Sequence, residues 1–223
     1  MKRHVIRRAL GALPLLLAAC AAGPKIVDRP VPFGERRQQL TREYIERQYG
    51  LKVNDITIVP RMIVLHWTAS DRFDVSYDTF IPDTTASRPD LLKAGNLNVG
   101  IQFLVGMDGK IYRLMPETWM ARHVIGLNYE AIGVENVGGQ RSVDNLTAAQ
   151  IEANAELVRY LVRRYPTIEY LIGHHEYRLF EGTPLWRERD PNYRTGKVDP
   201  GERFMNAVRT RVADLKLKGP PQR

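Results

Sequence analysis

Residues 62–68, Met-Ile-Val-Leu-His-Trp-Thr, are a dense run of β-favouring side chains that decides the fold of this chain. The run is apolar on both alternating faces until His66, which is the pattern of a central strand buried on both sides. An ionisable ring at the end of such a strand needs a partner or a metal to offset its lost hydration. Taken alone, such a histidine is more often a core residue satisfied by a hydrogen bond.

The segments around this strand alternate between strand-like and helix-like patterns. An Asp-Gly turn at residues 108–109 predicts a hairpin, because this dipeptide tolerates the positive φ angles of a tight turn. Thr147 and Gln150 form a capping-box pattern at the start of a long amphipathic helix. Strands are expected at residues 99–105, 110–115, 131–137 and 168–172, and helices at 40–50, 73–80, 147–165 and 204–215. This alternation indicates an α/β domain.

Composition indicates one folded domain and does not favour nucleic acid as its partner. The chain has 223 residues, of which 43% are hydrophobic and 26% charged, as in ordinary soluble domains. Its formal charge is +8, and four of its 33 basic residues precede residue 20, so the remaining 29 basic against 25 acidic residues leave a mildly basic chain. Lysine and arginine are scattered among acidic residues, so nucleic acid is excluded as the expected partner. We expect a monomer.

The first residues predict export and lipidation. A basic start, an apolar run at residues 9–17 and Ala18-Ala19 before Cys20 are typical of a signal peptide over residues 1–19. Residues 17–20 also resemble the bacterial lipobox, in which the cysteine becomes the lipid-modified first residue. Cys20 is the single cysteine, so it has no disulfide partner within the chain. The alternative is an ordinary signal peptide that is cut after Ala19 or Ala22.

The leader also suggests a location and a domain organisation. Ala21 stands where lipoproteins held at the inner membrane often carry Asp, which favours the outer membrane, facing the periplasm. Residues 20–37 are rich in Pro and Gly and predict a lipidated N-terminus with a flexible tether. The folded domain is expected over 38–217, followed by a frayed tail at 218–223.

A second stretch carries the composition of a metal site. Residues 172–176, Ile-Gly-His-His-Glu, are followed about twenty residues later by 196–201, Gly-Lys-Val-Asp-Pro-Gly. Histidine, lysine and aspartate are thereby brought to one short region, with glycine and proline shaping the turns. Which metal is bound is left open by these two segments.

Together these motifs resemble the zinc-dependent N-acetylmuramoyl-L-alanine amidases of type 2, relatives of the peptidoglycan recognition proteins. The resemblance runs from about Pro60 to Phe204 and implies a mixed central sheet flanked by helices in one domain. Each motif is weak alone, but six in the family's order are specific. They occur at residues 63–69 (IVLHWTA), 108–112 (DGKIY), 121–123 (ARH), 132–135 (IGVE), 173–174 (GH) and 197–201 (KVDPG).

The resemblance implies that His66, His174 and Asp199 ligate one zinc ion. Two imidazoles and a carboxylate leave a fourth position open, as in catalytic zinc sites. His175 is the neighbouring alternative to His174, and Asp190 is an alternative carboxylate that lacks the Lys-x-Asp-Pro-Gly context. A solvated loop acid is the preferred interpretation of Asp190.

The same resemblance assigns the catalytic residues. Glu135 would transfer protons, and Lys197 would stabilise the oxyanion of the tetrahedral intermediate. His123 is predicted to contact the substrate, although one extra residue follows it compared with relatives, and a structural histidine is the competing interpretation. Trp67 and Asn128 are the other predicted substrate contacts, and Tyr112 and Trp119 are weaker candidates because aromatic residues at these spacings are more often core.

The implied activity is cleavage of the amide between N-acetylmuramic acid and L-alanine in peptidoglycan or muropeptides. Two alternatives stay open. One is a muropeptide-binding module of the same fold that does not cut, and the intact ligand positions argue against it. The other is a zinc peptidase acting within the stem peptide. Residues 81–98 and 177–195 depart from the shortest family members and are expected to reshape the groove.

Overall fold

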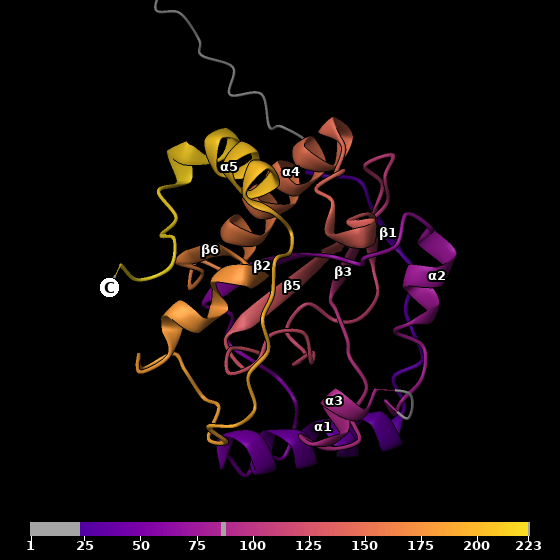
Figure 1. Ribbon diagram of the computed structural model, residues 1–223, viewed down its shortest axis with the longest axis vertical. Helices are drawn as coiled ribbons and strands as arrows, with labels where there is room; N and C mark the ends of the chain where they lie inside the picture. Colours follow the sequence, from indigo (N-terminus) through magenta and orange to yellow (C-terminus); the bar gives the residue numbers. More distant parts are fainter. Residues whose placement is uncertain (1–22, 86–87, 223) are drawn as a thin grey trace, which may run out of the picture.

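The computed structural model describes residues 23–85 and 88–222, which form a sheet between two helical layers (Figure 1). Within this part of the chain, the sheet has six strands in the order β1-β4-β3-β5-β2-β6. All neighbouring strands are parallel except β3 and β4. The strands are β1 (Ile26–Asp28), β2 (Met62–Trp67), β3 (Phe103–Val105), β4 (Ile111–Arg113), β5 (Ala131–Asn136) and β6 (Tyr170–Gly173). The helices are α1 (Glu35–Tyr49), α2 (Phe73–Asp78), α3 (Pro89–Leu92), α4 (Ala148–Arg164) and α5 (Glu202–Arg211), with 3-10 turns η1 (Gln140–Ser142), η2 (His174–Phe180) and η3 (Ala213–Leu215). The mixed α/β architecture in one domain is as the sequence predicts.

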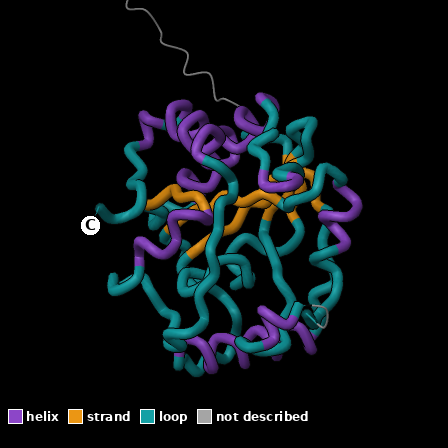
Figure 2. Tube along the Cα trace, viewed as in Figure 1, coloured by secondary structure: helices purple, strands orange, loops and turns teal. Residues whose placement is uncertain are grey.

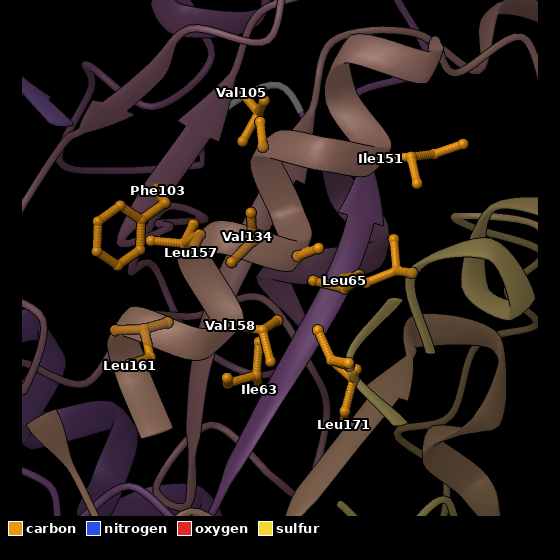
Figure 3. Close-up of a cluster of buried hydrophobic side chains, with 14 of the residues drawn as sticks. Ile63, Leu65, Phe103, Val105, Val134, Ile151, Leu157, Val158, Leu161 and Leu171 are labelled. Atoms are coloured by element: carbon orange, nitrogen blue, oxygen red, sulfur yellow. The ribbon is translucent and has the colours of Figure 1, made fainter. Parts of the chain in front are cut away.

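One face of the sheet is covered by α4 and α5. Side chains alternate along β2, so Ile63 and Leu65 lie on this face and are fully buried against the helices. Figure 3 shows Leu157, Val158 and Leu161 of α4 directed at the strands. Burial of such side chains stabilises by about 1.5–3 kcal/mol each, which makes this layer the main core of the domain.

The opposite face is covered largely by loops, with α1 beyond them (Figure 2). Met62 and Val64 of β2 lie on this face, in a second core with Tyr44 and Ile45 of α1. His66 is the next residue in the same alternation, so it also leaves the sheet on the loop-covered face. The sequence thus places an ionisable ring where loops can bring polar partners to it.

Several local predictions are confirmed. β3 and β4 pair as an antiparallel hairpin across the Asp-Gly turn, where Gly109 has φ +81°. The capping box is present, because the Thr147 side chain accepts from the Gln150 backbone N–H while Gln150 bonds the Thr147 N–H. The first helix ends at Gly50 in the left-handed conformation. The last helix is shorter than predicted, ending at Arg211 before Leu215 enters a 3-10 turn.

The prediction of a flexible tether over residues 20–37 is wrong for residues 23–37, the part the structure describes. Residues 26–28 join the sheet edge as β1, Val31 is buried, and α1 begins at Glu35. Pro and Gly here shape turns between packed residues. The tail is also more ordered than predicted at its start, because Lys218 bridges to Tyr170 of β6.

The export prediction falls outside the described residues. The signal peptide at 1–19, Cys20 and Ala21 precede residue 23, where the description begins. Among the described helices, none has both the length and the apolar character needed to cross a membrane.

Candidate active site and metal centre

Three polar side chains converge at the carboxyl ends of the central strands. His66 lies near the end of β2, His174 directly follows β6, and Asp199 lies in the loop before α5. His66 Nδ1 is 2.9 Å from His174 Nδ1 and 3.3 Å from Asp199 Oδ2, and His174 Nδ1 is 3.0 Å from the same oxygen. All three residues are buried. The two histidines are 108 positions apart in the sequence, so only the parallel sheet brings them together.

This donor set fits a divalent metal. Ligand atoms held at 2.0–2.1 Å around one tetrahedral zinc ion lie about 3.3 Å from one another. The three ligand atoms have this spacing, and they form the only such group among residues 23–85 and 88–222. Three protein ligands of the types N, N and O leave room for a fourth, which is the pattern of catalytic sites. The group can therefore hold a metal ion.

The electrostatics of the site favour ligating protonation states. Burial, followed by the neighbouring His174, lowers the pKa of His66 to about 4, so its ring is neutral at pH 7. Burial disfavours the charged form of Asp199, but the charge and hydrogen bonds of His174 and His66 outweigh it. They hold the pKa of Asp199 well below its usual range. A neutral imidazole and an ionised carboxylate are the forms that bind metal.

Glu135 lies beside this group. It is the register partner of His66 across β5 and β2, so the two side chains leave the sheet on the same face. Its Oε2 is buried and has no hydrogen-bond partner within the described chain. Burial first, and then the charge of Asp199, raise the pKa of Glu135 well above its usual range, while Lys197 opposes this. A buried carboxyl group without a partner is costly, and such groups cluster at functional sites.

A cavity of about 330 Å³ opens at this group. Besides His66, His174, Asp199 and Glu135, its lining includes Lys197 and His123. Lys197 is half-buried and has no ion-pair partner in the part of the chain that is described. The cavity therefore combines a metal-ligating group, an unpartnered carboxyl group and an unpaired cation, which is a set of groups suited to hydrolysis.

The two segments that depart from the shortest family members form walls of this cavity. From the first segment Arg88, Asp90 and Leu91 line it, and from the second Tyr193 and Thr195 do. Arg122, which is buried, ties the two together, because its guanidinium donates to the Leu91 carbonyl (2.6 Å) and to the Tyr193 hydroxyl (2.9 Å). Sequence reasoning missed this role. The Ala-Arg-His motif that contains Arg122 was the available signal, but nothing local shows which carbonyls the arginine reaches.

The predicted substrate contacts have different surroundings. Trp67 lines the cavity and packs on Gly139, where an added Cβ would be 2.2 Å from the indole ring. Asn128 is fully buried, and its side-chain oxygen accepts from the backbone N–H groups of His123 and Val124. Its amide donates to Tyr49. Both ends of the Asn128 side chain thus bond to the protein and support the loop that begins at His123. Asn128 also lines the cavity, and its substrate contact stays a prediction.

The two weaker aromatic candidates, Tyr112 and Trp119, lie away from the cavity. Tyr112 packs against Phe73, with ring centroids 4.6 Å apart, and Trp119 packs against Phe33 at 5.2 Å. Neither lines the cavity at the metal-ligating group. Tyr112 and Trp119 are therefore packing residues, which is the more common role of aromatic residues at such spacings.

The alternative ligands lie outside the group. His175 Nδ1 is 2.9 Å from the backbone oxygen of Asp199, and the His175 backbone N–H donates to the same oxygen. It therefore fixes the Asp199 main chain and does not face the other ligand atoms. Asp190 is exposed and accepts from the Asn192 N–H in a local turn.

Part of this chain is similar in sequence to known peptidoglycan-recognition proteins. Peptidoglycan-recognition protein SC2 of Drosophila melanogaster is 32% identical over 98 residues, which cover 42% of this chain and 53% of that protein. The same protein of Drosophila simulans matches equally. The chain thus spans about half the length of the curated relatives it matches.

One solved structure shows the same fold at low identity. Peptidoglycan recognition protein-LE, solved in complex with tracheal cytotoxin, superposes with a TM-score of 0.50 at 16% identity, covering 83% of this chain and 92% of that one. The endolysin amidase LysCS of Clostridium intestinale matches with a TM-score of 0.49 at 22% identity, covering 88% and 99%. The family model described as N-acetylmuramoyl-L-alanine amidase matches residues 56–202, more than half of the chain. This chain therefore belongs to the N-acetylmuramoyl-L-alanine amidase family.

Proposed function

We propose that this protein is a zinc-dependent hydrolase that cleaves the amide between the lactyl group of N-acetylmuramic acid and L-alanine in peptidoglycan or muropeptides. The observation that carries the proposal is the buried group of His66, His174 and Asp199 beside an unpartnered carboxyl group in one cavity. Membership of the family supports the choice of substrate bond. Retention of the complete ligand set favours catalysis over binding alone.

The chemistry follows from the positions of the residues. The two histidines and the aspartate would hold a zinc ion, which would supply Lewis-acid polarisation of the scissile carbonyl. Glu135 accepts a proton from the attacking water and delivers it to the leaving amine of L-alanine. The fixed positive charge of Lys197 stabilises the oxyanion of the tetrahedral intermediate. The amide C–N bond breaks, a C–O bond forms, and the products are a free lactyl carboxylate and a free stem peptide.

Glu135 must be ionised to accept that proton. Without metal, burial and Asp199 keep its pKa raised. A cation bound next to it favours the ionised form, because an opposite charge within a few ångströms offsets desolvation. Lys197 acts in the same direction. A bound metal therefore favours the ionised form of Glu135, which is the form that can act as the base.

Mass spectrometry of a muropeptide digest tests the proposal. The purified full chain, loaded with zinc, should release free stem peptide from N-acetylmuramic acid, and a chelator should abolish the release. Cleavage between two amino acids of the stem would instead establish the zinc peptidase alternative. Binding of muropeptides without any cleavage by zinc-loaded protein would establish the binding module.

We propose further that the protein is lipid-anchored through Cys20 at the outer membrane and faces the periplasm. This rests on the leader sequence, which lies outside the described residues. Expression of the full-length chain in a bacterium supplied with a labelled fatty acid should label the protein, and Cys20→Ser should abolish the label. An unlabelled wild-type protein in the soluble periplasmic fraction would contradict the anchor.

A further inference from the structure

The His66 ring lies between two sets of partners on its two nitrogens. Its Nδ1 faces His174 Nδ1 at 2.9 Å and Asp199 Oδ2 at 3.3 Å. Its Nε2 faces His123 Nδ1 at 3.0 Å. The rings of His66 and His123 meet edge to face, with their planes at 83°. One nitrogen of His66 is thus in the metal-ligating group, and the other is in contact with a second histidine.

When a metal is bound, the position of the single proton on the His66 ring decides the role of each ring nitrogen. A ligating imidazole nitrogen carries no proton, so the other nitrogen of the neutral ring carries it and must find an acceptor. With Nδ1 of His66 as the ligand atom, Nε2–H of His66 donates to His123 Nδ1. His123 then carries its own proton on Nε2. Among the described residues, His66 Nε2 has no other hydrogen-bond partner, so His123 is the acceptor available to it.

The protein holds the His123 ring in this position from several sides. Asn128 Oδ1 accepts from the backbone N–H of His123 at 2.8 Å. The ring lies over Gly133 of β5, where an added Cβ would be 2.8 Å from Nδ1 and 2.9 Å from Cε1. Glycine is therefore needed at this position for the ring to approach the sheet closely.

The second nitrogen of His123 does not serve the cavity. His123 Nε2 is buried, and no group of the described chain forms a hydrogen bond with it. It is therefore not an exposed donor that could reach a bound substrate. His123 is among the residues that line the cavity, and its Nδ1 faces His66 Nε2.

We propose that His123 is the positioning residue of His66. By accepting the Nε2–H, it selects the tautomer and the ring orientation that leave Nδ1 of His66 free to ligate the metal. This replaces the substrate contact predicted for His123 from the sequence, and it rests on the zinc site of the proposed function. Partners of this kind typically contribute 10–100-fold to metal affinity.

Zinc affinity measured by competition with a chromophoric chelator tests this role. The full chain is compared with His123→Leu, which removes the acceptor, and with His123→Asn, whose side-chain oxygen stands close to the position of Nδ1. His123→Leu should weaken zinc binding by about 10–100-fold, and His123→Asn should recover most of the loss. Ile101→Val is the matched control, because Ile101 packs on the same Gly133 but makes no hydrogen bond to His66. It should bind zinc as the wild type does.

A spectroscopic measurement keeps the test independent of how the variants fold. In zinc-loaded wild-type protein with ¹⁵N-labelled histidine, long-range ¹H–¹⁵N spectra should show His66 protonated at Nε2 and metal-bound at Nδ1. The opposite tautomer would overturn the proposal, as would a folded His123→Leu variant with wild-type zinc affinity. Absence of zinc binding by the wild type would overturn both the proposed metal site and this inference. Zinc binding with the expected tautomer but without cleavage would contradict only the proposed activity.

Discussion

His66 and Glu135 are register partners on the adjacent parallel strands β2 and β5, and both leave the sheet on its loop-covered face. Each lies at a strand position on a buried face of the sheet, where an apolar residue would be expected. The hydrogen-bonded ladder of the sheet therefore fixes the position of the His66 ring relative to the Glu135 carboxyl group. Loops supply the other groups, and the consequences can be tested residue by residue.

Replacement of Glu135 should separate catalysis from metal binding. Glu135→Gln keeps the shape of the side chain but cannot accept a proton, so turnover of muropeptides should fall by about 10²–10⁴-fold. Zinc content should stay at one ion per chain, because Glu135 is not among the ligand atoms. Kinetics and metal analysis on the same preparation measure both. Glu156→Gln on the exposed side of α4 is the control, and near-normal turnover by Glu135→Gln would refute the proton-transfer role.

Zinc should stabilise the wild-type fold, and Asp199→Asn should remove most of this effect. A ligand that binds only the folded state stabilises it by about 2.7 kcal/mol at 100 times its dissociation constant. The wild-type melting temperature should therefore rise with zinc and return to its starting value with a chelator. Asn lacks the negative charge of the third ligand, so the rise should be much smaller. An equal rise in both proteins would place the metal elsewhere.

The two neighbouring histidines should differ sharply on replacement. His174→Ala removes a ligand atom and should abolish tight zinc binding. His175→Ala removes a hydrogen bond to the Asp199 carbonyl, which is worth about 1 kcal/mol, so zinc affinity should fall only about fivefold. Calorimetric titration of both variants with zinc makes the comparison. Similar losses in the two would contradict the assignment of His174 as the ligand.

Arg122 should be essential for the cavity walls. Arg122→Met leaves the Leu91 carbonyl and the Tyr193 hydroxyl without their donor, so the free energy of unfolding should fall by about 2–4 kcal/mol. Arg122→Lys should recover part of this, because an ammonium cannot reproduce the planar fork. Urea denaturation gives the free energies. Arg88→Met, at an exposed arginine of the same wall, should change them little, and hydrogen exchange should accelerate at residues 88–98 only in the Arg122 variants.

Glu188 should make stability depend on pH in an unusual direction for a carboxylate. Burial raises its pKa from 4.5 to about 7, and its Oε2 has no hydrogen-bond partner within the described chain. The folded state therefore holds this proton more tightly than the unfolded state. The resulting stability is fully present below about pH 4.5 and is lost as the pH rises through about 7.

Urea denaturation at pH 5 and pH 8 measures this contribution. Glu188→Gln is neutral throughout, so its free energy of unfolding should fall less than that of the wild type between the two pH values. Glu156→Gln should follow the wild type, because Glu156 is exposed. Parallel curves for wild type and Glu188→Gln would show that Glu188 does not titrate in this range.

Much of the architecture could be predicted from local patterns. The apolar alternation of residues 62–65 and the spacing of residues 151–162 are set by short-range periodicity, so β2 and α4 follow from them. The Asp-Gly turn and the Thr147 cap depend on residues within four positions of each other. By contrast, the Pro/Gly-rich residues before α1 were predicted to be a tether, because composition does not show that an edge of the sheet is available for pairing.

The sequence by itself determined the fold class, the family and the residue types of the metal-ligating group, because these are written in ordered motifs and local periodicity. Only the tertiary structure decided which nitrogen of His66 joins His174 and Asp199, that His123 lies behind it, and that Asn128 supports a loop. These relationships join positions as far as 108 residues apart. The reason is physical: the direction of a side chain and the partner of each polar atom are set by packing and hydrogen bonding between distant segments, which no local pattern contains.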